Sequence, residues 1–387
     1  MLRHVYPRHF WQGQIERLWR ERSVVWVSGV RRSGKTTLCR ALGDVEYFDC
    51  ELPRVRRALV DPEAFLEDHR GRRIVLDEIH RIDDPAELLK IAADHFPGTR
   101  IIATGSSTLG ASQRFRDTLS GRKRTLWLSP MLDADGVDFG REDVARRMLH
   151  GGLPELLLSE RFPEDDYRDW MDGYWAKDLQ TLFRLERRDG FEKLMELLFV
   201  QSGGMFEAAG LAASCGMSHP TVQSYVRALE VTFVVHVVRP FHAGSSREIV
   251  RAPKVYGFDT GFVCYFRGWN PLRPDDYGSL WEHLVLNELF GALQTRDIRY
   301  WRDKSGREVD FLLPSRRGHA IAIEAKWSAD AFDPRGLRAL RARHEHGSNL
   351  VVAHDVGPAH RRDYGGLTVE LVPLGDLGAA VRRAAGR

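Results

Sequence analysis

The hydrophobic residues in the first third of the chain follow two alternating patterns. Short apolar runs rich in β-branched residues occupy positions 24–27, 74–76 and 101–103. Ahead of the first run, apolar residues recur at helical spacing, at Ile15, Leu18 and Trp19. Uninterrupted apolar runs are typical of strands buried on both faces of a parallel sheet. Residues 1–132 are therefore predicted to form an α/β domain.

A glycine-rich loop follows the first predicted strand. Residues 29–36 read Gly-Val-Arg-Arg-Ser-Gly-Lys-Thr, which fits the phosphate-loop pattern of nucleotide-binding proteins. Lys35 would reach the β and γ phosphates of ATP, and the Thr36 hydroxyl would bind Mg²⁺. The alternative is a glycine loop that binds no ligand. The residues expected to bind the nucleotide and its metal are Gly29, Arg32, Ser33, Gly34, Lys35, Thr36, Thr37, Asp77 and Ser106.

Two acidic residues follow the predicted strand at 72–76. Ligands of open α/β sheets bind at the carboxyl ends of the strands, where Asp77 and Glu78 would lie. Asp77 is expected to hold Mg²⁺ through water, and Glu78 to orient and deprotonate the attacking water. Together with the phosphate loop, this pair indicates an ATPase that hydrolyses its nucleotide.

Two further candidates belong to the same site. Ser106, with Thr104 behind it, follows the strand at 100–104 and could sense the γ-phosphate; a plain serine-rich turn is the alternative. Arg122 could complete the site of a neighbouring subunit, as in ring-forming ATPases, or be a solvated surface residue.

The middle of the chain is predicted to be helical. Residues 133–190 contain few β signals, and their aromatic and aliphatic residues are spaced like the buried face of one connecting helix. These residues are Trp170, Tyr174, Trp175, Leu179 and Leu182.

Residues 191–262 are predicted to form a winged helix-turn-helix. A short helix at 207–215, a turn at 216–218 and a helix at 220–230, with Ser218 as cap and Pro220 in its first turn, make the helix-turn-helix. The run at 231–238 and a return near Val250 would form the wing. The alternative is a module that contacts other proteins. It stays open because the second helix carries only one firm positive charge, Arg227, with which to attract DNA. The predicted DNA contacts are His219, Thr221, Gln223, Ser224, Arg227 and Arg247.

Residues 275–387 are predicted to form an α/β domain with acidic residues at strand positions. Strands are expected at 298–302, 307–313 and 320–326, with Val309, Phe311 and Leu313 on one face. Metal-activated water cuts a phosphodiester where oxygen ligands converge. The predicted metal ligands are Glu282, Asp310 and Glu324, and Lys326 would polarise the water. One alternative is that Glu324 and Lys326 form a surface ion pair, and another is that the domain binds DNA without cleaving it.

The order of these motifs resembles AAA+-type ATPases of bacteria and archaea that carry an uncharacterised C-terminal domain. The resemblance rests on residues 29–37, 76–80, 104–107, 119–122, 151–155 (Gly-Gly-Leu-Pro-Glu) and 254–261 (Lys-Val-Tyr-Gly-Phe-Asp-Thr-Gly). It implies an AAA+ domain, a winged helix and a restriction-endonuclease-like domain with a PD-(D/E)xK pattern.

Composition changes this picture little. The chain of 387 residues has a net charge of +3 from 57 basic and 54 acidic residues, so net charge does not argue for a nucleic-acid partner. Four cysteines without a metal spacing, and the absence of an apolar stretch of membrane length, predict a cytoplasmic protein.

These features predict a Mg²⁺-dependent, DNA-stimulated ATPase that oligomerises, with a hexameric ring as one such assembly. It would bind, remodel or cleave duplex or branched DNA in repair, recombination or defence. The alternatives are a nucleotide-controlled regulatory switch with an inactive nuclease-like domain, and a nuclease for RNA.

Overall fold

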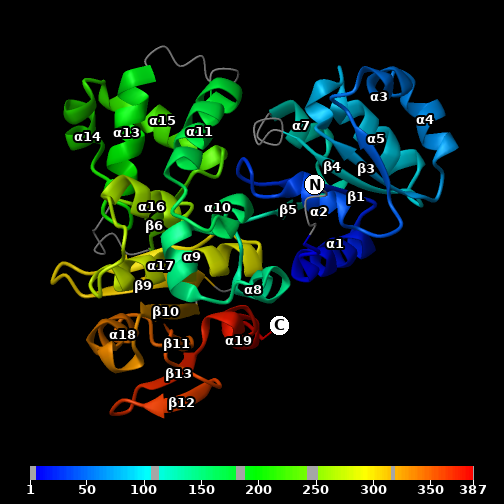
Figure 1. Cartoon of the computed structure of the whole chain (residues 1–387). Helices are drawn as coiled ribbons and strands as arrows, with labels where there is room; N and C mark the ends of the chain where they lie inside the picture. The colour runs from blue at the N-terminus through cyan, green and yellow to red at the C-terminus, as the bar shows by residue number, and fades with distance from the viewer. Residues whose placement is uncertain (1–5, 106–112, 180–187, 242–251, 315–318, 387) are drawn as a thin grey trace.

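A five-stranded parallel sheet organises the N-terminal part of the chain (Figure 1), as the apolar runs predicted. The computed structural model describes residues 6–105, 113–179, 188–241, 252–314 and 319–386. The strand order is β2-β3-β4-β1-β5. The strands are β1 (Val24–Ser28), β2 (Glu46–Asp49), β3 (Arg73–Asp77), β4 (Arg100–Thr104) and β5 (Lys123–Trp127).

Helices cover both faces of this sheet because its central strands alternate between two apolar clusters. Val25 and Ile102 pack with α1 (His9–Glu21) and α2 (Lys35–Arg40). Trp26 and Ile101 pack on the other face, with the helices that follow β2, β3 and β4. Those helices are α3 (Pro53–Ala58), α4 (Pro62–Asp68), α5 (Pro85–His95) and α7 (Gln113–Thr118).

The middle of the chain is helical, as predicted. Its elements are α8 (Asp133–Phe139), α9 (Val144–His150), α10 (Pro154–Leu158), α11 (Glu164–Tyr174) and a π-helical turn, η2 (Trp175–Leu179). The predicted aromatic face is buried at Trp170, Tyr174, Trp175 and Leu179. It lies on α11 and on the π-helical turn that continues it, not on one regular helix, and Leu182 lies outside the described residues.

The two helices, the turn and the cap predicted at 207–230 are confirmed. After α13 (Arg188–Val200) come α14 (Ala208–Cys215) and α15 (His219–Val231). Gly216 ends α14 with φ 61°, and the Ser218 Oγ accepts the N–H of Thr221 at 3.2 Å. Pro220 occupies the first turn of α15, where a missing N–H costs no hydrogen bond.

The two strands that follow α15 pair with each other but belong to a larger sheet than the predicted wing. The return predicted near Val250 lies outside the described residues. Antiparallel β6 (Val235–Pro240) and β7 (Lys254–Gly257) form one end of an eight-stranded sheet of order β12-β13-β11-β10-β9-β8-β6-β7. The sheet therefore runs through the boundary predicted between 191–262 and 275–387. Its other strands are β8 (Arg299–Arg302), β9 (Glu308–Pro314), β10 (Ala320–Lys326), β11 (Asn349–Ala353), β12 (His360–Asp363) and β13 (Thr368–Val372).

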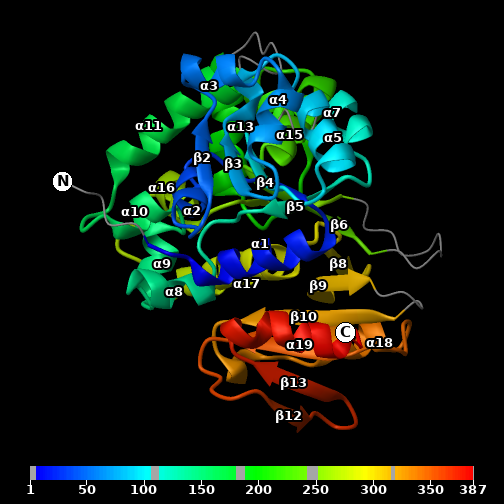
Figure 2. The ribbon, with the colours of Figure 1, turned by 90° about the vertical axis from the view of Figure 1, so that its right-hand side faces the viewer.

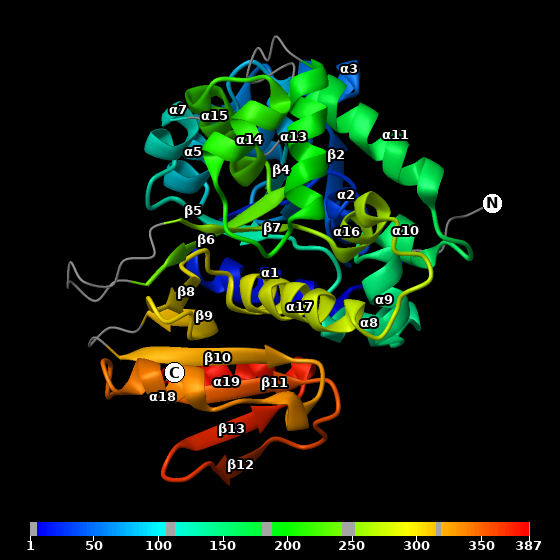
Figure 3. The same cartoon turned by 90° about the vertical axis from the view of Figure 1, so that its left-hand side faces the viewer.

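Helix α17 (Asp276–Leu293) connects the two halves of the molecule. Figures 2 and 3 show the strands β10 to β13 on the opposite side of α17 from the N-terminal sheet. Its C-terminal Ala292 packs in the cluster that contains Trp11 of α1, while Trp281 packs against the larger sheet. Helix α19 (Leu377–Ala384) packs on the same face of the larger sheet as α17, and α18 (Arg335–Arg341) covers the opposite face. Helix α16 (Thr260–Arg267) packs on α9.

The predicted alternation along β9 is wrong at one residue. Phe311 and Leu313 share a cluster, but Val309 packs on the opposite face with Leu312. The reason is an irregular register, because Arg299 pairs with Leu312 while Trp301, two residues on, pairs with Val309. Three residues of β9 therefore oppose two of β8, and such a bulge turns the side chains on either side of it to new faces.

Among the helices within the described ranges, none is both long enough and apolar enough to cross a membrane.

Candidate nucleotide site and carboxylate cluster

The phosphate loop lies between β1 and α2, as predicted, and its backbone requires small residues. A Cβ atom at Gly29 would lie 2.3 Å from the carbonyl oxygen of Leu128. Gly34 has φ 93°, in the left-handed region that favours glycine. Arg32 also has a positive φ, 59°, and the buried Oγ of Ser33 has no hydrogen-bond partner among the described residues. The loop therefore places polar groups around a hollow rather than packing them against one another.

Lys35 lies over its own loop. Its Nζ donates to the carbonyl oxygens of Gly29 at 3.0 Å and Val30 at 3.1 Å. Burial lowers the pKa of Lys35, and the charges of Glu78, Asp178 and Asp77 oppose this shift. The ammonium group thus stands where three carboxylates and the loop carbonyls surround it.

Asp77 joins the phosphate loop to three strands of the sheet. Its carboxylate accepts hydrogen bonds from the hydroxyls of Thr36, at 2.8 Å, Tyr47 and Thr104. Asp77 itself ends β3 and is buried, with 3% of its surface exposed. Thr104 therefore lies behind the site, as predicted, whereas Tyr47 was not predicted, because only the pairing of β2 with β3 brings it near.

Glu78 is held at the strand end in an unusual backbone conformation. Its φ of 54° lies in the left-handed region, and its N–H donates to the Thr104 Oγ1 at 3.1 Å. Its carboxylate lies 3.1 Å from the His80 Nδ1. Burial alone would raise the pKa of Glu78, but His80, Lys35 and Arg31 lower it, so the carboxylate is ionised at neutral pH. His80 is a site residue that the sequence did not single out.

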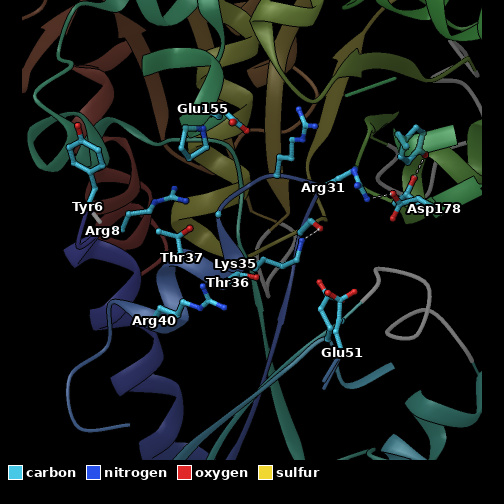
Figure 4. A pocket seen from close by; sticks show the side chains of 18 of the residues that line it. Tyr6, Arg8, Arg31, Lys35, Thr36, Thr37, Arg40, Glu51, Glu155 and Asp178 are labelled. Carbon is cyan, nitrogen blue, oxygen red and sulfur yellow. Dashed lines mark hydrogen bonds and ion pairs between the residues drawn. The ribbon is translucent and has the colours of Figure 1, made fainter. Parts of the chain in front are cut away.

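The phosphate loop, Glu78 and His80 line one pocket of about 1210 Å³, shown in Figure 4. Asp77 is not part of this lining but contacts it through the Thr36 hydroxyl. The phosphate loop and Glu78 form one part of its wall. Tyr6 and Phe139, whose rings stack at 4.4 Å, form another, beside Leu158. The predicted binding residues Gly29, Arg32, Gly34, Lys35, Thr36 and Thr37 all line it.

Of the other residues predicted for this site, Ser33 and Asp77 are buried and are not part of the pocket lining. Ser106 falls outside the described residues. Arg122 lies away from the pocket lining, where its Nε contacts the Asp94 Oδ1 at 2.8 Å on the surface, so its action in a neighbouring subunit stays a prediction.

The helical segment contributes one charged residue that the sequence did not indicate. Asp178, on the π-helical turn η2, lines the pocket, and its Oδ2 lies 3.4 Å from the Nη1 of Arg31 in the phosphate loop. Figure 4 shows the two side chains pointing toward each other. Only the packing of α11 against the loop brings them together.

The motif at 151–155 meets the motif at 254–261. The Gly152 N–H donates to the Asp259 Oδ2 at 2.7 Å, and a Cβ on Gly151 would lie 1.9 Å from the Asp259 Oδ1. Burial raises the pKa of Asp259 to about 6 even though several backbone N–H groups lower it. Pro154, two residues beyond Gly152, lines the nucleotide pocket, so this contact fixes one wall of the pocket.

A second polar cluster lies in the C-terminal sheet. The Lys326 Nζ contacts the Glu324 Oε2 at 2.7 Å and the Asp310 Oδ2 at 2.9 Å. The Ala325 N–H also donates to Asp310, at 2.9 Å. Burial and the nearby Asp310 raise the pKa of Glu324 well above its ordinary range. With only 5% of the Glu324 side chain exposed, the alternative of a surface ion pair is wrong.

Glu282 lies in a neighbouring group and not beside Glu324. It contacts the Lys254 Nζ at 3.5 Å and the Tyr256 hydroxyl, and Lys254 also contacts Glu308. Burial and the charge of Asp310 raise the pKa of Glu282, so the two groups adjoin. Within the described ranges no three acidic, histidine or cysteine side chains form a cluster that could hold a metal ion, and metal binding by Glu282, Asp310 and Glu324 stays a prediction.

The predicted DNA-contact residues lie on one exposed helix. On α15, His219, Gln223, Ser224 and Arg227 are exposed, while Thr221 is half-buried and bonded to Ser218. Arg247 lies outside the described residues.

Comparisons with known families divide the chain into three parts. Residues 21–133 match a family described as an AAA domain. Residues 141–273 and 277–375 match two domains of unknown function, DUF8612 and DUF4143. The first part of the chain is therefore similar to an AAA domain, and the other two matches assign no activity.

Relatives and solved structures add no activity. The uncharacterised proteins Rv2008c of Mycobacterium tuberculosis and Mb2031c of Mycobacterium bovis are each 29% identical over 328 residues, 82% of this chain and 73% of theirs. A Walker-type ATPase of Pyrococcus abyssi is similar over 68% of this chain and 96% of its own, with 15% identity and a TM-score of 0.45. DnaA of Aquifex aeolicus is similar over 59% and 92%, with 12% identity and a TM-score of 0.29. The assignment of the first domain rests on the family match and the site geometry, since both TM-scores are below 0.5.

Proposed function

We propose that the chain is a Mg²⁺-dependent ATP hydrolase. The observation that carries the proposal is the pocket lined by Lys35, Thr36 and an ionised Glu78, in which the Thr36 hydroxyl also contacts Asp77 at 2.8 Å. A hydroxyl and a carboxylate in contact supply the oxygen ligands that Mg²⁺ prefers. The ionised Glu78 is the group that can orient and deprotonate water.

The residues of the loop fit a bound triphosphate. Ser33 holds a buried hydroxyl with no partner among the described residues, and Lys35 has loop carbonyls as its hydrogen-bond acceptors. The backbone N–H groups of 29–37 and the Lys35 ammonium would bind the phosphates, with Thr36 and Asp77 holding Mg²⁺. Bound Mg²⁺ neutralises phosphate charge. The stacked rings of Tyr6 and Phe139, beside Leu158, offer an apolar place for the adenine base.

We also propose that the ATPase acts on DNA, duplex or branched, in repair, recombination or defence, as an oligomer in which Arg122 serves a neighbouring site. The exposed polar face of α15 supports contact with DNA. The buried group of Asp310, Glu324 and Lys326 supports a metal-dependent phosphodiester site. Lys326 would polarise the water there, and Glu282 would add a third ligand by a side-chain movement.

A second candidate function is a nucleotide-controlled regulatory switch whose C-terminal domain binds without cutting. It is favoured by Lys326, whose ammonium group already contacts both Asp310 and Glu324. In that case ATP turnover would be slow and independent of DNA.

The test measures ATP turnover and DNA cleavage in the same samples, with single-stranded, duplex and four-way DNA and with Mg²⁺ or Mn²⁺. Lys35→Ala is expected to abolish turnover, and Glu78→Gln to lower it about 10²-fold or more. Lys90→Ala, which changes an exposed lysine, is the matched control. Glu324→Ala is expected to abolish cleavage and leave turnover intact.

The results separate the two candidates. Cleavage lost in Glu324→Ala supports the nuclease, and DNA-stimulated turnover without cleavage leaves a remodelling ATPase. Slow turnover that DNA does not change favours the switch. Turnover in Lys35→Ala equal to that of the unchanged chain would refute the proposed ATPase site.

A further inference from the structure

Asp178 brings a negative charge to the phosphate end of the nucleotide pocket. It comes from η2, a segment about 140 residues after the loop, and its partner Arg31 lies between the two glycines of that loop. Both side chains are largely buried, with 25% of Arg31 and 17% of Asp178 exposed. A contact between a carboxylate and the proposed phosphate-binding loop is unexpected, because the Asp178 carboxylate and a bound phosphate would compete for the same positive charges.

The groups around Asp178 are those that would face the terminal phosphate. Lys35, Glu78 and Asp178 line the same pocket, and their charges act on one another. The Nε of Arg31 is buried with no hydrogen-bond partner in the described part of the chain, so the guanidinium has a free donor even with Asp178 in place. Arg31 can thus take another acceptor.

Two hydrogen bonds connect α11, the helix that η2 continues, to the phosphate loop and to the end of α15. The Trp170 Nε1 of α11 donates to the carbonyl oxygen of Arg31 at 3.1 Å. The Tyr174 hydroxyl lies 2.5 Å from the Oγ1 of Thr232, the residue that ends α15. The hydrogen-bond pattern changes from α-helical to π-helical directly after Tyr174, and such turns occur often at functional sites. A movement of Asp178 would therefore act on α11 and on the end of α15.

We propose that Asp178 is a residue that discriminates between nucleoside triphosphate and diphosphate, an inference that rests on the proposed ATP site. In the diphosphate or nucleotide-free state, Asp178 neutralises Arg31. A γ-phosphate beside Lys35 repels this carboxylate and takes over Arg31, so that η2 leaves the loop. Triphosphate binding is weakened because the Arg31–Asp178 pair must separate, whereas diphosphate binding leaves the pair intact. The movement of η2 that accompanies triphosphate binding is passed to the end of α15.

The test compares Asp178→Asn with the unchanged full-length chain by direct binding of a fluorescent, non-hydrolysable ATP analogue and of fluorescent ADP. Removal of the charge is expected to tighten analogue binding about tenfold, which corresponds to about 1.4 kcal/mol, and to change ADP binding little. Asp178→Glu, which keeps the charge, should retain the discrimination. Asp172→Asn is the matched control, because Asp172 lies on α11 but is exposed and paired with Arg188.

Hydrogen exchange of residues 164–179 gives an independent readout. In the unchanged chain, exchange there should rise with the ATP analogue and not with ADP, and in Asp178→Asn it should be raised already without nucleotide. Equal tightening for both nucleotides, or none for either, would overturn the inference. Failure of the unchanged chain to bind either nucleotide would instead refute the proposed ATP site.

Discussion

Asp135 is the most consequential carboxylate outside the two sites, because it connects the N-terminal residues, α8 and the phosphate loop. It accepts hydrogen bonds from Arg8 Nε at 2.9 Å and Nη2 at 2.7 Å, Trp11 Nε1 at 3.1 Å and the Leu132 N–H at 2.9 Å. The other guanidinium nitrogen of Arg8 donates to the Ser33 carbonyl oxygen at 2.9 Å. We therefore predict that Asp135→Asn destabilises the fold and weakens nucleotide binding.

The size of the effect follows from burial. Arg8 is 2% exposed and Asp135 0%, so loss of the carboxylate leaves a buried guanidinium without its counter-charge. Breaking a buried ion pair in this way costs about 3–5 kcal/mol. Replacing both partners, as in Arg8→Met with Asp135→Leu, leaves no unpaired charge and should recover part of that loss of unfolding free energy. The recovery is incomplete because the Trp11 Nε1, the Leu132 N–H and the Ser33 carbonyl oxygen lose their partners.

The assay is urea unfolding followed by tryptophan fluorescence, with ATP-analogue affinity measured alongside. Burial would raise the pKa of Asp135, but the Arg8 charge and the hydrogen bonds lower it. The stabilisation is therefore present at neutral pH and is lost as the pH falls through the acidic range. Glu67→Gln, which breaks an exposed pair with Arg70, is the control. A loss below about 1 kcal/mol for Asp135→Asn, or a double variant no more stable than it, would refute the reasoning.

Two further predictions concern buried groups of the central region. Burial raises the pKa of Glu288 to about 7, above its unfolded value, so its charged form opposes folding. As the pH rises from about 4.5 to 7, the unfolding free energy of the unchanged chain should fall by up to about 3 kcal/mol relative to that of Glu288→Gln. Parallel pH profiles of the two chains in urea unfolding would contradict this. Gly151→Ala should destabilise the chain more than Gly268→Ala, which costs about 1–2 kcal/mol for a left-handed alanine. The reason is that the added Cβ at Gly151 meets the buried Asp259, while no atom lies within 4 Å of a Cβ at Gly268. Equal shifts of the urea unfolding midpoint in the two variants would contradict this prediction.

Local patterns predicted the elements of this fold well. The apolar runs placed β1, β3 and β4, and the Ser218 cap with Pro220 placed the start of α15, because an apolar run and a helix cap are both written in consecutive residues. The spacing of the phosphate loop and the acidic pair likewise predicted Lys35, Thr36 and Glu78 in one pocket, with Asp77 in contact with Thr36. This part of the proposed ATP site could be predicted because a strand, a loop and a helix that are consecutive in the chain supply most of its residues.

Long-range contacts decided the rest. The bulge in β9 that turns Val309 depends on the register with β8, and the placement of Glu282 with Lys254 depends on how α17 and β7 approach the same strands. Neither is encoded in a local pattern, since register is fixed by packing across the whole sheet.

The sequence by itself determined that this chain has a phosphate loop followed by an acidic pair at the end of a buried strand, because short-range geometry and side-chain chemistry suffice for both. Only the tertiary structure decided what closes the pocket around them. Tyr47, His80 and Asp178 enter the site through strand pairing, a left-handed residue and the packing of a π-helical turn. Those contacts join residues up to 147 positions apart, over which no spacing rule acts.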